Sequence, residues 1–157
     1  MRIRLYRKEE CREIIQLFYD TVHSVNTRDY TESQLAVWAP QVDQINLLVW
    51  EKSLRENYTV VAEDNNMIVG FGDIDSTGYL DRLFVHKDFQ QQGIASKILN
   101  ELEQYAKDKG FSFITTEASI TAKLFFEKYG YEILKEQQIE RNGQILTNYL
   151  MRKKFIK

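Results

Sequence analysis

The hydrophobic pattern of the chain begins with a strand and then changes to helical spacing. Polar and apolar residues alternate in "RIRLYR" at residues 2–7, as in a half-buried strand. Over Lys8–His23 apolar residues recur at helical spacings, and "NTRD" ends the pattern. A capping box at Thr31–Gln34 starts a second helical stretch, which Pro40 divides into two short helices, the second from about Gln41.

The middle of the chain consists of β-rich runs. "YTVVAED", "MIVGFGDIDS" and "YLDRLFVH", within residues 58–86, are separated by the turn signals Asn65-Asn66 and Thr77-Gly78. This pattern predicts a meander of antiparallel strands. A long amphipathic helix follows over Gly93–Gly110, and then the strand "FSFITTEA" at residues 111–118. Because strand, helix and strand form a crossover unit, the strands before and after this helix should be parallel.

The last part of the chain returns to a short helix and a hairpin. "SITAKLFFEKYGY" predicts a helix closed by Gly130, and residues 132–155 predict two strands around an Asn142-Gly143 turn. The predicted order is β-α-α-β-β-β-α-β-α-β-β. We expect one α+β domain over residues 1–157, with a central mixed sheet of about six or seven strands flanked by about four or five helices.

Composition limits the partners and the location of the protein. The chain has 157 residues, 43% of them hydrophobic, which suits one sizeable core. A net charge of −2 gives no bulk attraction to nucleic acid or anionic membranes, and only the end, "MRKKFIK", is basic. The lone Cys11 forms no internal disulfide, and "MRIRLYRKEE" lacks a signal-peptide core. We expect a cytoplasmic monomer or homodimer without nucleic-acid or membrane partners.

The turn that opens the long helix has the composition of an anion site. A helix start presents unpaired N–H groups and the positive end of the helix dipole. Residues 89–95 contain no Asp or Glu, and Gly93 and Ala95 leave the backbone open to a phosphate. Alternatively, Gly93 only permits the turn and the three glutamines are solvated. The P-loop and G-x-G-x-x-G patterns are absent, which disfavours ATP and NAD.

The same turn carries a family resemblance. Gln90-x-x-Gly93-x-Ala95, after the strand "LDRLFVH", resembles the Gln/Arg-x-x-Gly-x-Gly/Ala signature of the GNAT superfamily of acyl-CoA-dependent N-acetyltransferases. The segment "TEASITAKLFFEKYGYE" is similar to that family's second signature, which ends in an aromatic-Glu-Lys-x-Gly-aromatic run. Both elements stand in the family's order, and the resemblance covers roughly residues 58–155.

The resemblance implies acetyl-CoA as the acyl donor. In this family the pyrophosphate lies on N–H groups of the turn, and the pantetheine arm pairs with the preceding strand like an extra strand. The expected coenzyme contacts are therefore Leu83, Phe84, Val85, Gln90, Gln91, Gln92, Gly93, Ile94, Ala95, Ser96, Ser119, Ala122, Lys123 and Phe126. No metal is expected, because His23 and His86 have no partners at metal-ligand spacing.

The strand region "GDIDSTGYLDRLF" offers a base for the acceptor. An amine with a lysine-like pKa of about 10.4 must lose a proton before it attacks a thioester. Strand alternation places Tyr79, Asp81 and Leu83 on one face, so Asp81 is the predicted base. The alternative is a solvent-facing strand carboxylate paired with Arg82 or Lys87. Glu117, at the end of the next strand, is the reserve base.

One departure from the family concerns the general acid. Many members carry a Tyr at the position of Phe126, and that Tyr is proposed to protonate the leaving thiolate. Tyr129 is the substitute in this sequence, or else a packing residue beside Gly130. A thiolate whose conjugate acid has a pKa of about 8.5 can also leave without a protein acid. The missing Tyr keeps open an alternative function, a non-catalytic acyl-CoA-binding or sensing domain.

The acceptor pocket is expected between the N-terminal helices and the C-terminal hairpin. Tyr30 and Trp38, in "DYTESQLAVWAP", are its predicted wall, although they could simply pack a helix on the sheet. Asp73 and Asp75 are further predicted acceptor contacts. The leading prediction is transfer of an acetyl group to a primary amine of a small molecule or peptide. Transfer should be direct, in a ternary complex, because Cys11 lies outside the coenzyme motif.

Overall fold

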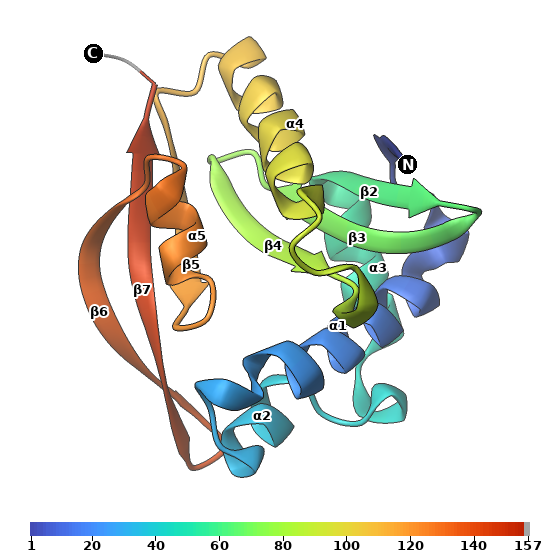
Figure 1. Ribbon diagram of the computed structural model, residues 1–157, viewed down its shortest axis with the longest axis vertical. Coiled ribbons are helices and arrows are strands. Elements are labelled where there is room, and N and C mark those ends of the chain that lie inside the picture. Colours follow the sequence, from blue (N-terminus) through green and yellow to red (C-terminus); the bar gives the residue numbers. More distant parts are fainter. Residues whose placement is uncertain (156–157) are drawn as a thin grey trace.

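One seven-stranded sheet organises the molecule, a computed structural model that describes residues 1–155 (Figure 1). In sheet order the strands are β1 (Arg2–Leu5), β2 (Tyr58–Asp64), β3 (Met67–Ile74), β4 (Tyr79–Val85), β5 (Phe113–Ser119), β7 (Gln144–Lys154) and β6 (Glu132–Arg141). All neighbouring strands are antiparallel except β4 and β5, which are parallel. The α+β class, the mixed sheet and the parallel crossover pair are therefore confirmed.

Helices cover both faces of this sheet. They are α1 (Cys11–Val25), α2 (Glu32–Trp38), α3 (Leu47–Glu56), α4 (Ile94–Asp108) and α5 (Lys123–Lys128). Apolar side chains of α4 and α5 form one core cluster with the sheet, whereas those of α1, α2 and α3 form a second cluster on the opposite face. The two clusters bury both faces of the sheet at β2 and β3, whereas β6 is largely exposed.

The region before β2 differs from the predicted order. Three α-helices precede β2, as the three predicted helical segments require, whereas the predicted order counted the two segments on either side of Pro40 as one. The capping box of Thr31 and Gln34 is present. The next helix starts at Leu47 rather than near Gln41, because the side chain of Asn46 accepts the first-turn N–H of Val49 and a 3₁₀ turn fills the gap.

The turn residues are those that the sequence indicated. Asn65 and Asn66 join β2 to β3 with φ angles of 51° and 64°, and Asn142 and Gly143 join β6 to β7 with φ angles of 46° and 84°. These left-handed conformations suit Asn and Gly and close tight antiparallel hairpins. The predicted meander and C-terminal hairpin are confirmed.

Helix α4 lies unusually close to the sheet at β3. A Cβ atom on Gly72 would lie 2.8 Å from Cγ2 of Ile98 on α4. Only a residue without a side chain permits this approach. The contact fixes the position of α4, and with it the position of the turn at its N-terminus.

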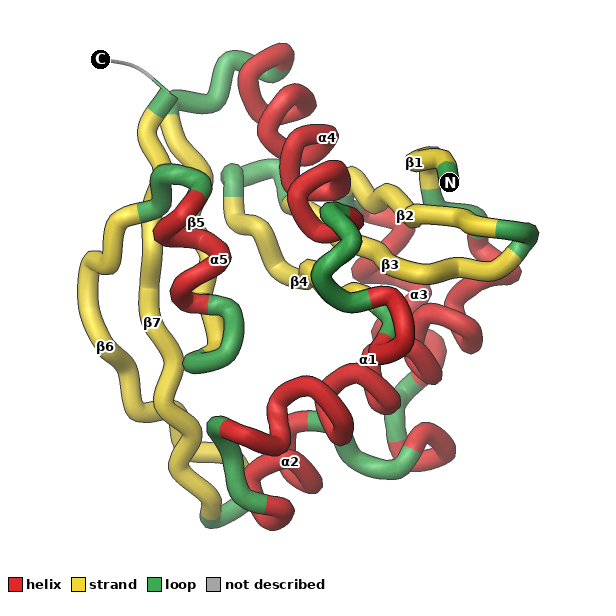
Figure 2. The backbone as a smooth tube through the Cα atoms, viewed as in Figure 1, coloured by secondary structure: helices red, strands yellow, loops and turns green. Residues whose placement is uncertain are grey.

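Strands β4 and β5 separate soon after they begin. They pair only at Tyr79 with Thr115 and at Leu80 with Thr116. Beyond this point β4 turns away from β5 and β7, as Figure 2 shows. The edge of β4 from Asp81 to Val85 consequently has no strand partner on the β5 side. An open edge of this kind can receive the amide groups of a ligand.

A β-bulge stands at the point of separation. On β3, Asp73 pairs with Arg82 whereas Ile74 pairs with Leu80, so Asp81 is the extra residue. The bulge interrupts the alternation of β4, and Leu83 packs against the core cluster under α4. Tyr79, Asp81 and Leu83, which the sequence placed on one face, all line the same cleft.

Within residues 1–155, no helix combines the length and the apolar content that crossing a membrane would require.

Candidate functional site

The turn before α4 presents a row of unpaired backbone N–H groups. Gln91 and Gly93 have φ angles of 60° and 80°, and Gly93 is the N-cap of α4. Among the described residues, no hydrogen bond is donated by the backbone N–H groups of Gln91, Gln92, Gly93, Ile94, Ala95 and Ser96. The first turn of α4 contains no acidic residue. The geometry is that of an anion cradle at a helix start.

Gln90 braces this cradle rather than facing a ligand. Its Nε2 donates to the carbonyl oxygen of Val85 at 2.6 Å, tying the turn to the end of β4. The Val85 oxygen also accepts a hydrogen bond from Oγ1 of Thr21 on α1. That carbonyl is thus already engaged, and Leu83 and Phe84 carry the open part of the strand edge.

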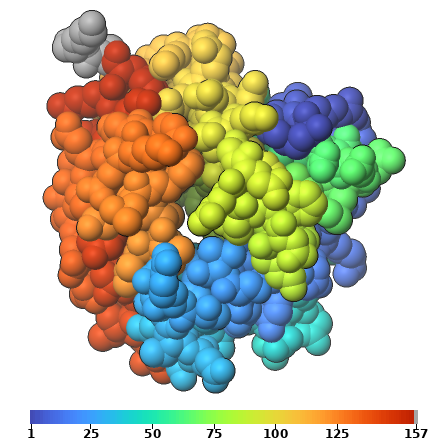
Figure 3. All heavy atoms as spheres, viewed as in Figure 1, coloured from blue at the N-terminus to red at the C-terminus, as the bar shows by residue number. Residues whose placement is uncertain are grey.

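A cleft of about 570 Å³ opens where the two strands separate. It is lined by residues of α1, α2, α3, α5, β4, β5 and the C-terminal hairpin, and its size suits a small molecule. Figure 3 shows the surface hollowed between α5, α4 and the N-terminal helices. The lining includes several predicted site residues, namely Tyr30, Trp38, Asp81, Leu83, Phe84, Glu117, Ser119, Ala122 and Phe126.

The carboxylates of Asp81 and Glu117 both line the cleft, on the two strands that separate. Asp81 is about one third exposed, and its Oδ2 lies 3.7 Å from Nη1 of Arg82. Both oxygens of Glu117 accept hydrogen bonds, from the Tyr79 hydroxyl at 2.8 Å and from Nε2 of Gln137 at 2.7 Å. Burial, reinforced by the Glu117 carboxylate, holds the pKa of the Tyr79 phenol well above its usual range. Asp81 is therefore the less engaged of the two carboxylates.

Asp73 lies beneath this site and does not line it. It is fully buried, and its Oδ2 accepts hydrogen bonds from Arg82 and from Nδ2 of Asn57 at 3.0 Å. Nη2 of Arg82 also donates to Oγ of Ser53 at 3.0 Å. The predicted acceptor contact at Asp73 was wrong, since its carboxylate fixes Arg82 next to the bulge.

Burial raises the pKa of Asp73 to about 6, although Arg82 and Asn57 favour its charged form. A carboxyl whose folded pKa exceeds its unfolded value loses stability as the pH rises between the two values, here from 3.8 to about 6. The free energy of unfolding of the wild type, minus that of Asp73→Asn, should therefore fall by about 2 kcal/mol from pH 4 to 7. Urea titrations of both proteins at each pH measure this difference in the free energy of unfolding. A difference that grows with pH would contradict the raised pKa of Asp73.

Asp75 likewise serves the fold rather than the cleft. Its Oδ1 accepts hydrogen bonds from the backbone N–H groups of Thr77 and Tyr79 and from the Thr77 hydroxyl. It closes the turn between β3 and β4 and is not part of the lining. The predicted acceptor contact at Asp75 was wrong, because turn residues and pocket residues can have the same polar signature in sequence.

The substitute general acid does not reach the cleft. Tyr129 lies outside the lining and packs its ring 5.0 Å from that of Phe125. Phe126 lines the cleft, is 4% exposed and packs on Tyr131. Lys123 lies with its Nζ over the ring of Tyr149. Tyr129 is accordingly a packing residue, the other reading that the sequence allowed.

Tyr30 and Trp38 do meet at the cleft, as the wall prediction required. Their rings are 5.5 Å apart, and both line it. The Tyr30 hydroxyl donates to the carbonyl oxygen of Thr147 at 2.6 Å and accepts from the N–H of Ile120 at 2.9 Å. Tyr30 thereby joins the helical layer to β7 and to the segment after Ser119.

Several residues of the cleft were missed from the sequence. Phe18, Trp50, Tyr79, Arg82 and Arg141 all line it. Each comes from a different element or from a strand position beside the bulge, so only tertiary structure brings them together. For Tyr79, strand alternation with Asp81 was a signal in the sequence that it could line the same cleft.

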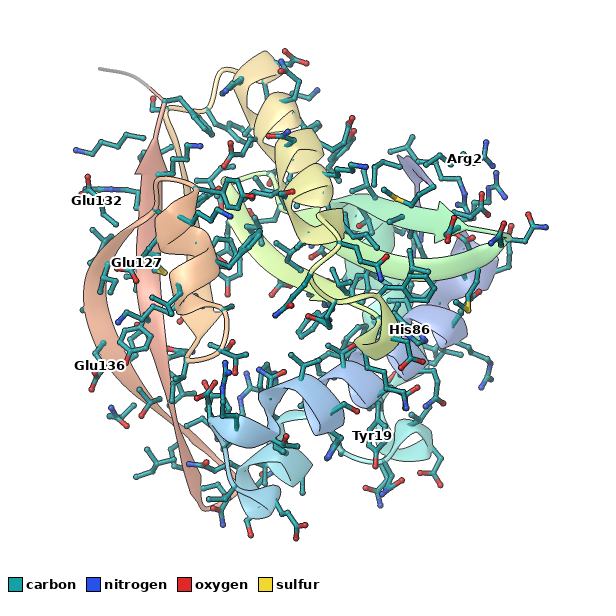
Figure 4. All side chains as sticks on the ribbon, in the orientation of Figure 1. Arg2, Tyr19, His86, Glu127, Glu132 and Glu136 are labelled. Atoms are coloured by element: carbon teal, nitrogen blue, oxygen red, sulfur yellow. The ribbon has the colours of Figure 1, made fainter. Side chains whose placement is uncertain are left out.

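Side chains far from the cleft help to delimit the site. Figure 4 shows Glu132 and Glu136 projecting outward from β6, and both are exposed. His86 follows β4, and its Nδ1 accepts the N–H of Asp88. Residues 1–155 contain no group of three or more His, Cys, Asp or Glu side chains placed to hold a metal ion.

The site combines a split parallel pair, an anion cradle at the adjoining helix and carboxylates in the cleft, an arrangement that suits a ligand with a phosphate group and an amide-bearing arm. The chain belongs to the GNAT acetyltransferase family, because residues 26–153 match the family model described as an acetyltransferase (GNAT) domain. It is an acetyltransferase, and the family expectation from the two sequence signatures is confirmed.

Similar proteins agree with this assignment. The chain is 34% identical over 155 residues to an uncharacterized N-acetyltransferase of Escherichia coli K12, YafP, covering 98% of this chain and 96% of that one. A GCN5-related N-acetyltransferase from Rhodopseudomonas palustris superposes with a TM-score of 0.92 at 27% identity, over 98% and 95% of the two chains. YncA of Salmonella typhimurium, solved with acetyl-CoA, has the same fold, with a TM-score of 0.72 at 17% identity over 100% and 95%.

Proposed function

We propose that this protein transfers an acetyl group from acetyl-CoA to a primary amine, directly and in a ternary complex. The observation that carries the proposal is the opening between β4 and β5, with the cradle at α4 on one side and the carboxylates of Asp81 and Glu117 in the cleft on the other. A thioester arm that follows the edge of β4 would bring its carbonyl carbon to the cleft. The relative from Salmonella typhimurium, solved with acetyl-CoA, supports this choice of donor.

The chemistry requires few groups. The ammonium group of the acceptor loses one proton to Asp81, and the free amine nitrogen attacks the thioester carbon. The tetrahedral intermediate then collapses: the nitrogen releases its second proton to solvent, and the carbon–sulfur bond breaks as the thiolate leaves. A backbone N–H on the open edge of β4 stabilises the oxyanion. Phe126 stands at the family's acid position, and Tyr129 lies outside the cleft, so no tyrosine is placed to protonate the thiolate. The thiolate, whose conjugate acid has a pKa of about 8.5, takes its proton from solvent.

Cys11 is an unsuitable acyl carrier, which favours direct transfer. It is 3% exposed, its Sγ faces the carbonyl oxygen of Leu47, and it is not part of the cleft lining. Burial raises the pKa of the Cys11 thiol, so the nucleophilic thiolate is scarce. Steady-state CoA release with a panel of amines tests the proposed activity, and release equal to that without an amine would refute it.

Acetyl-CoA should stabilise the folded protein, because only the native state forms the cradle. At a concentration 100 times the Kd, the gain is about 2.7 kcal/mol, which corresponds to a rise in Tm of roughly 5–10 °C for a chain of this size. Thermal melting measures it. S-acetylpantetheine, which lacks the pyrophosphate, is the matched control and should raise Tm much less. Equal shifts would place the binding energy outside the cradle.

A further inference from the structure

A continuous row of aromatic rings forms one side of the cleft. We call the aromatic wall the five residues Trp50, Phe18, Phe84, Trp38 and Tyr30. Successive ring centroids along it are 4.9, 5.1, 6.4 and 5.5 Å apart. The rings come from α1, α2, α3, β4 and the segment before α2, so distant parts of the chain converge on one surface.

The aromatic wall offers mainly ring surface. Phe18 and Tyr30 are 5% and 7% exposed, whereas Trp38, Trp50 and Phe84 keep more of their surface open. The Tyr30 hydroxyl is fully engaged by the backbone at Thr147 and Ile120. A bound molecule therefore meets apolar, rigid surface on this side, with Ile139 and Leu146 of the hairpin also lining the cleft.

The charges of the cleft are unevenly distributed. Asp81 and Glu117 are acidic, and the guanidinium of Arg82 is engaged by Asp73 and Ser53 and stacks 4.5 Å from the ring centroid of Trp50. The other basic residue in the cleft lining is Arg141. It stands four residues along β6 from Gln137, which contacts Glu117, and four strand residues span about 13 Å. Among the described lining residues, Arg141 is thus the cation without a side-chain partner, and its backbone is well separated from that of Gln137 beside Glu117.

We propose that the acceptor is a primary amine attached to an aromatic or bulky apolar group, without a carboxylate next to the amine nitrogen. This inference rests on the proposed function of the site. The ammonium group faces Asp81 and Glu117, and the apolar body lies on Trp38 and Phe84. A carboxylate beside the nitrogen, as in an α-amino acid, would meet the like charge of Asp81 and Glu117, because the free cation of the lining, Arg141, stands further along β6.

Matched acceptor pairs test this directly. Tryptamine and tryptophan, or phenethylamine and phenylalanine, differ only in the carboxylate, and spermidine supplies an amine without an apolar ring. With saturating acetyl-CoA, kcat/KM for each arylalkylamine should exceed that of its amino acid and of spermidine by at least about 100-fold. An amino acid or spermidine that matches or exceeds the arylalkylamine overturns the inference while leaving the proposed function intact. No acetylation of any amine overturns both.

Variants of the aromatic wall provide a second test. Trp38→Ala should raise KM for tryptamine about tenfold and leave KM for acetyl-CoA unchanged. Trp38→Phe, which keeps a ring, should retain most of the affinity for tryptamine. It allows the test to be made even if Trp38→Ala does not fold. Leu124→Ala, on an α5 side chain that is 74% exposed and outside the cleft, is the control. An unchanged KM for tryptamine in folded Trp38→Ala overturns the assignment of the aromatic wall.

Discussion

The Gly93→Glu variant is expected to fold and to lose nearly all affinity for acetyl-CoA. Gly93 is the N-cap of α4, and a Cβ atom there would have only Oγ of Ser96 nearby, at 3.9 Å, so the new side chain has room. It would place a carboxylate where the pyrophosphate should lie. Two like charges about 4 Å apart near a protein surface repel by about 4 kcal/mol, which corresponds to roughly a 1,000-fold increase in Kd.

Two matched variants separate charge from backbone strain. Gly93→Ala imposes the same left-handed strain without the charge and should keep the Kd within a few-fold of the wild type. Gly110→Glu makes the same substitution after the other end of α4, at a glycine that also has a φ of 80°. Calorimetric titration with acetyl-CoA and thermal melting of all three compare binding with folding. A folded Gly93→Glu variant with wild-type affinity would show that the coenzyme binds elsewhere.

Most of the fold was predictable because its signals are local. The Asn65-Asn66 and Asn142-Gly143 turns close their hairpins with the positive φ angles that Asn and Gly tolerate. The long helix ends as predicted, since Gly110 adopts a φ of 80° just after α4. Signals of this kind depend on neighbouring residues only, and tertiary contacts did not override them.

The coenzyme side of the candidate site was also accessible from sequence. An anion cradle is built from backbone N–H groups, so its sequence signature is the glycine and the missing acids of one short turn. The exception is Gln90, whose side chain braces the turn through Val85. A polar residue in a binding motif can either contact the ligand or hold the backbone of the motif in place. The amino-acid sequence does not distinguish these two roles.

The acceptor side was much less predictable, because it depends on register and on contacts between distant elements. The bulge at Asp81 arises from the pairing of β3 with β4, in which Asp73 meets Arg82 and Ile74 meets Leu80. Strand alternation could not show that Asp73 is buried against Arg82. Nor could helical spacing show that Trp38 and Trp50 meet a common cleft from different helices.

The structure sharpens the case for Asp81 as the base. Glu117 already accepts two hydrogen bonds, from Tyr79 and Gln137, and would have to release one to receive a proton from the amine. Asp81 makes one long contact with Arg82, at 3.7 Å, and projects from the bulge into the cleft. A carboxylate with free lone pairs, next to the open strand edge, is suited to take the proton of an ammonium group.

The Asp81→Asn variant should therefore lower kcat by roughly 10²–10⁴-fold, the usual contribution of general base catalysis. KM for acetyl-CoA should be unchanged, because the cradle lies at the other end of β4. Activity should recover in part as the pH approaches about 10, where a lysine-like amine loses its proton without help. The pH profile of kcat with saturating acetyl-CoA measures this. Glu117→Gln, the matched exchange on the facing strand, should keep kcat within about tenfold. If Glu117→Gln instead shows the large loss and Asp81→Asn turns over at the wild-type rate, Glu117 is the base, and the amine approaches from the β5 side of the cleft.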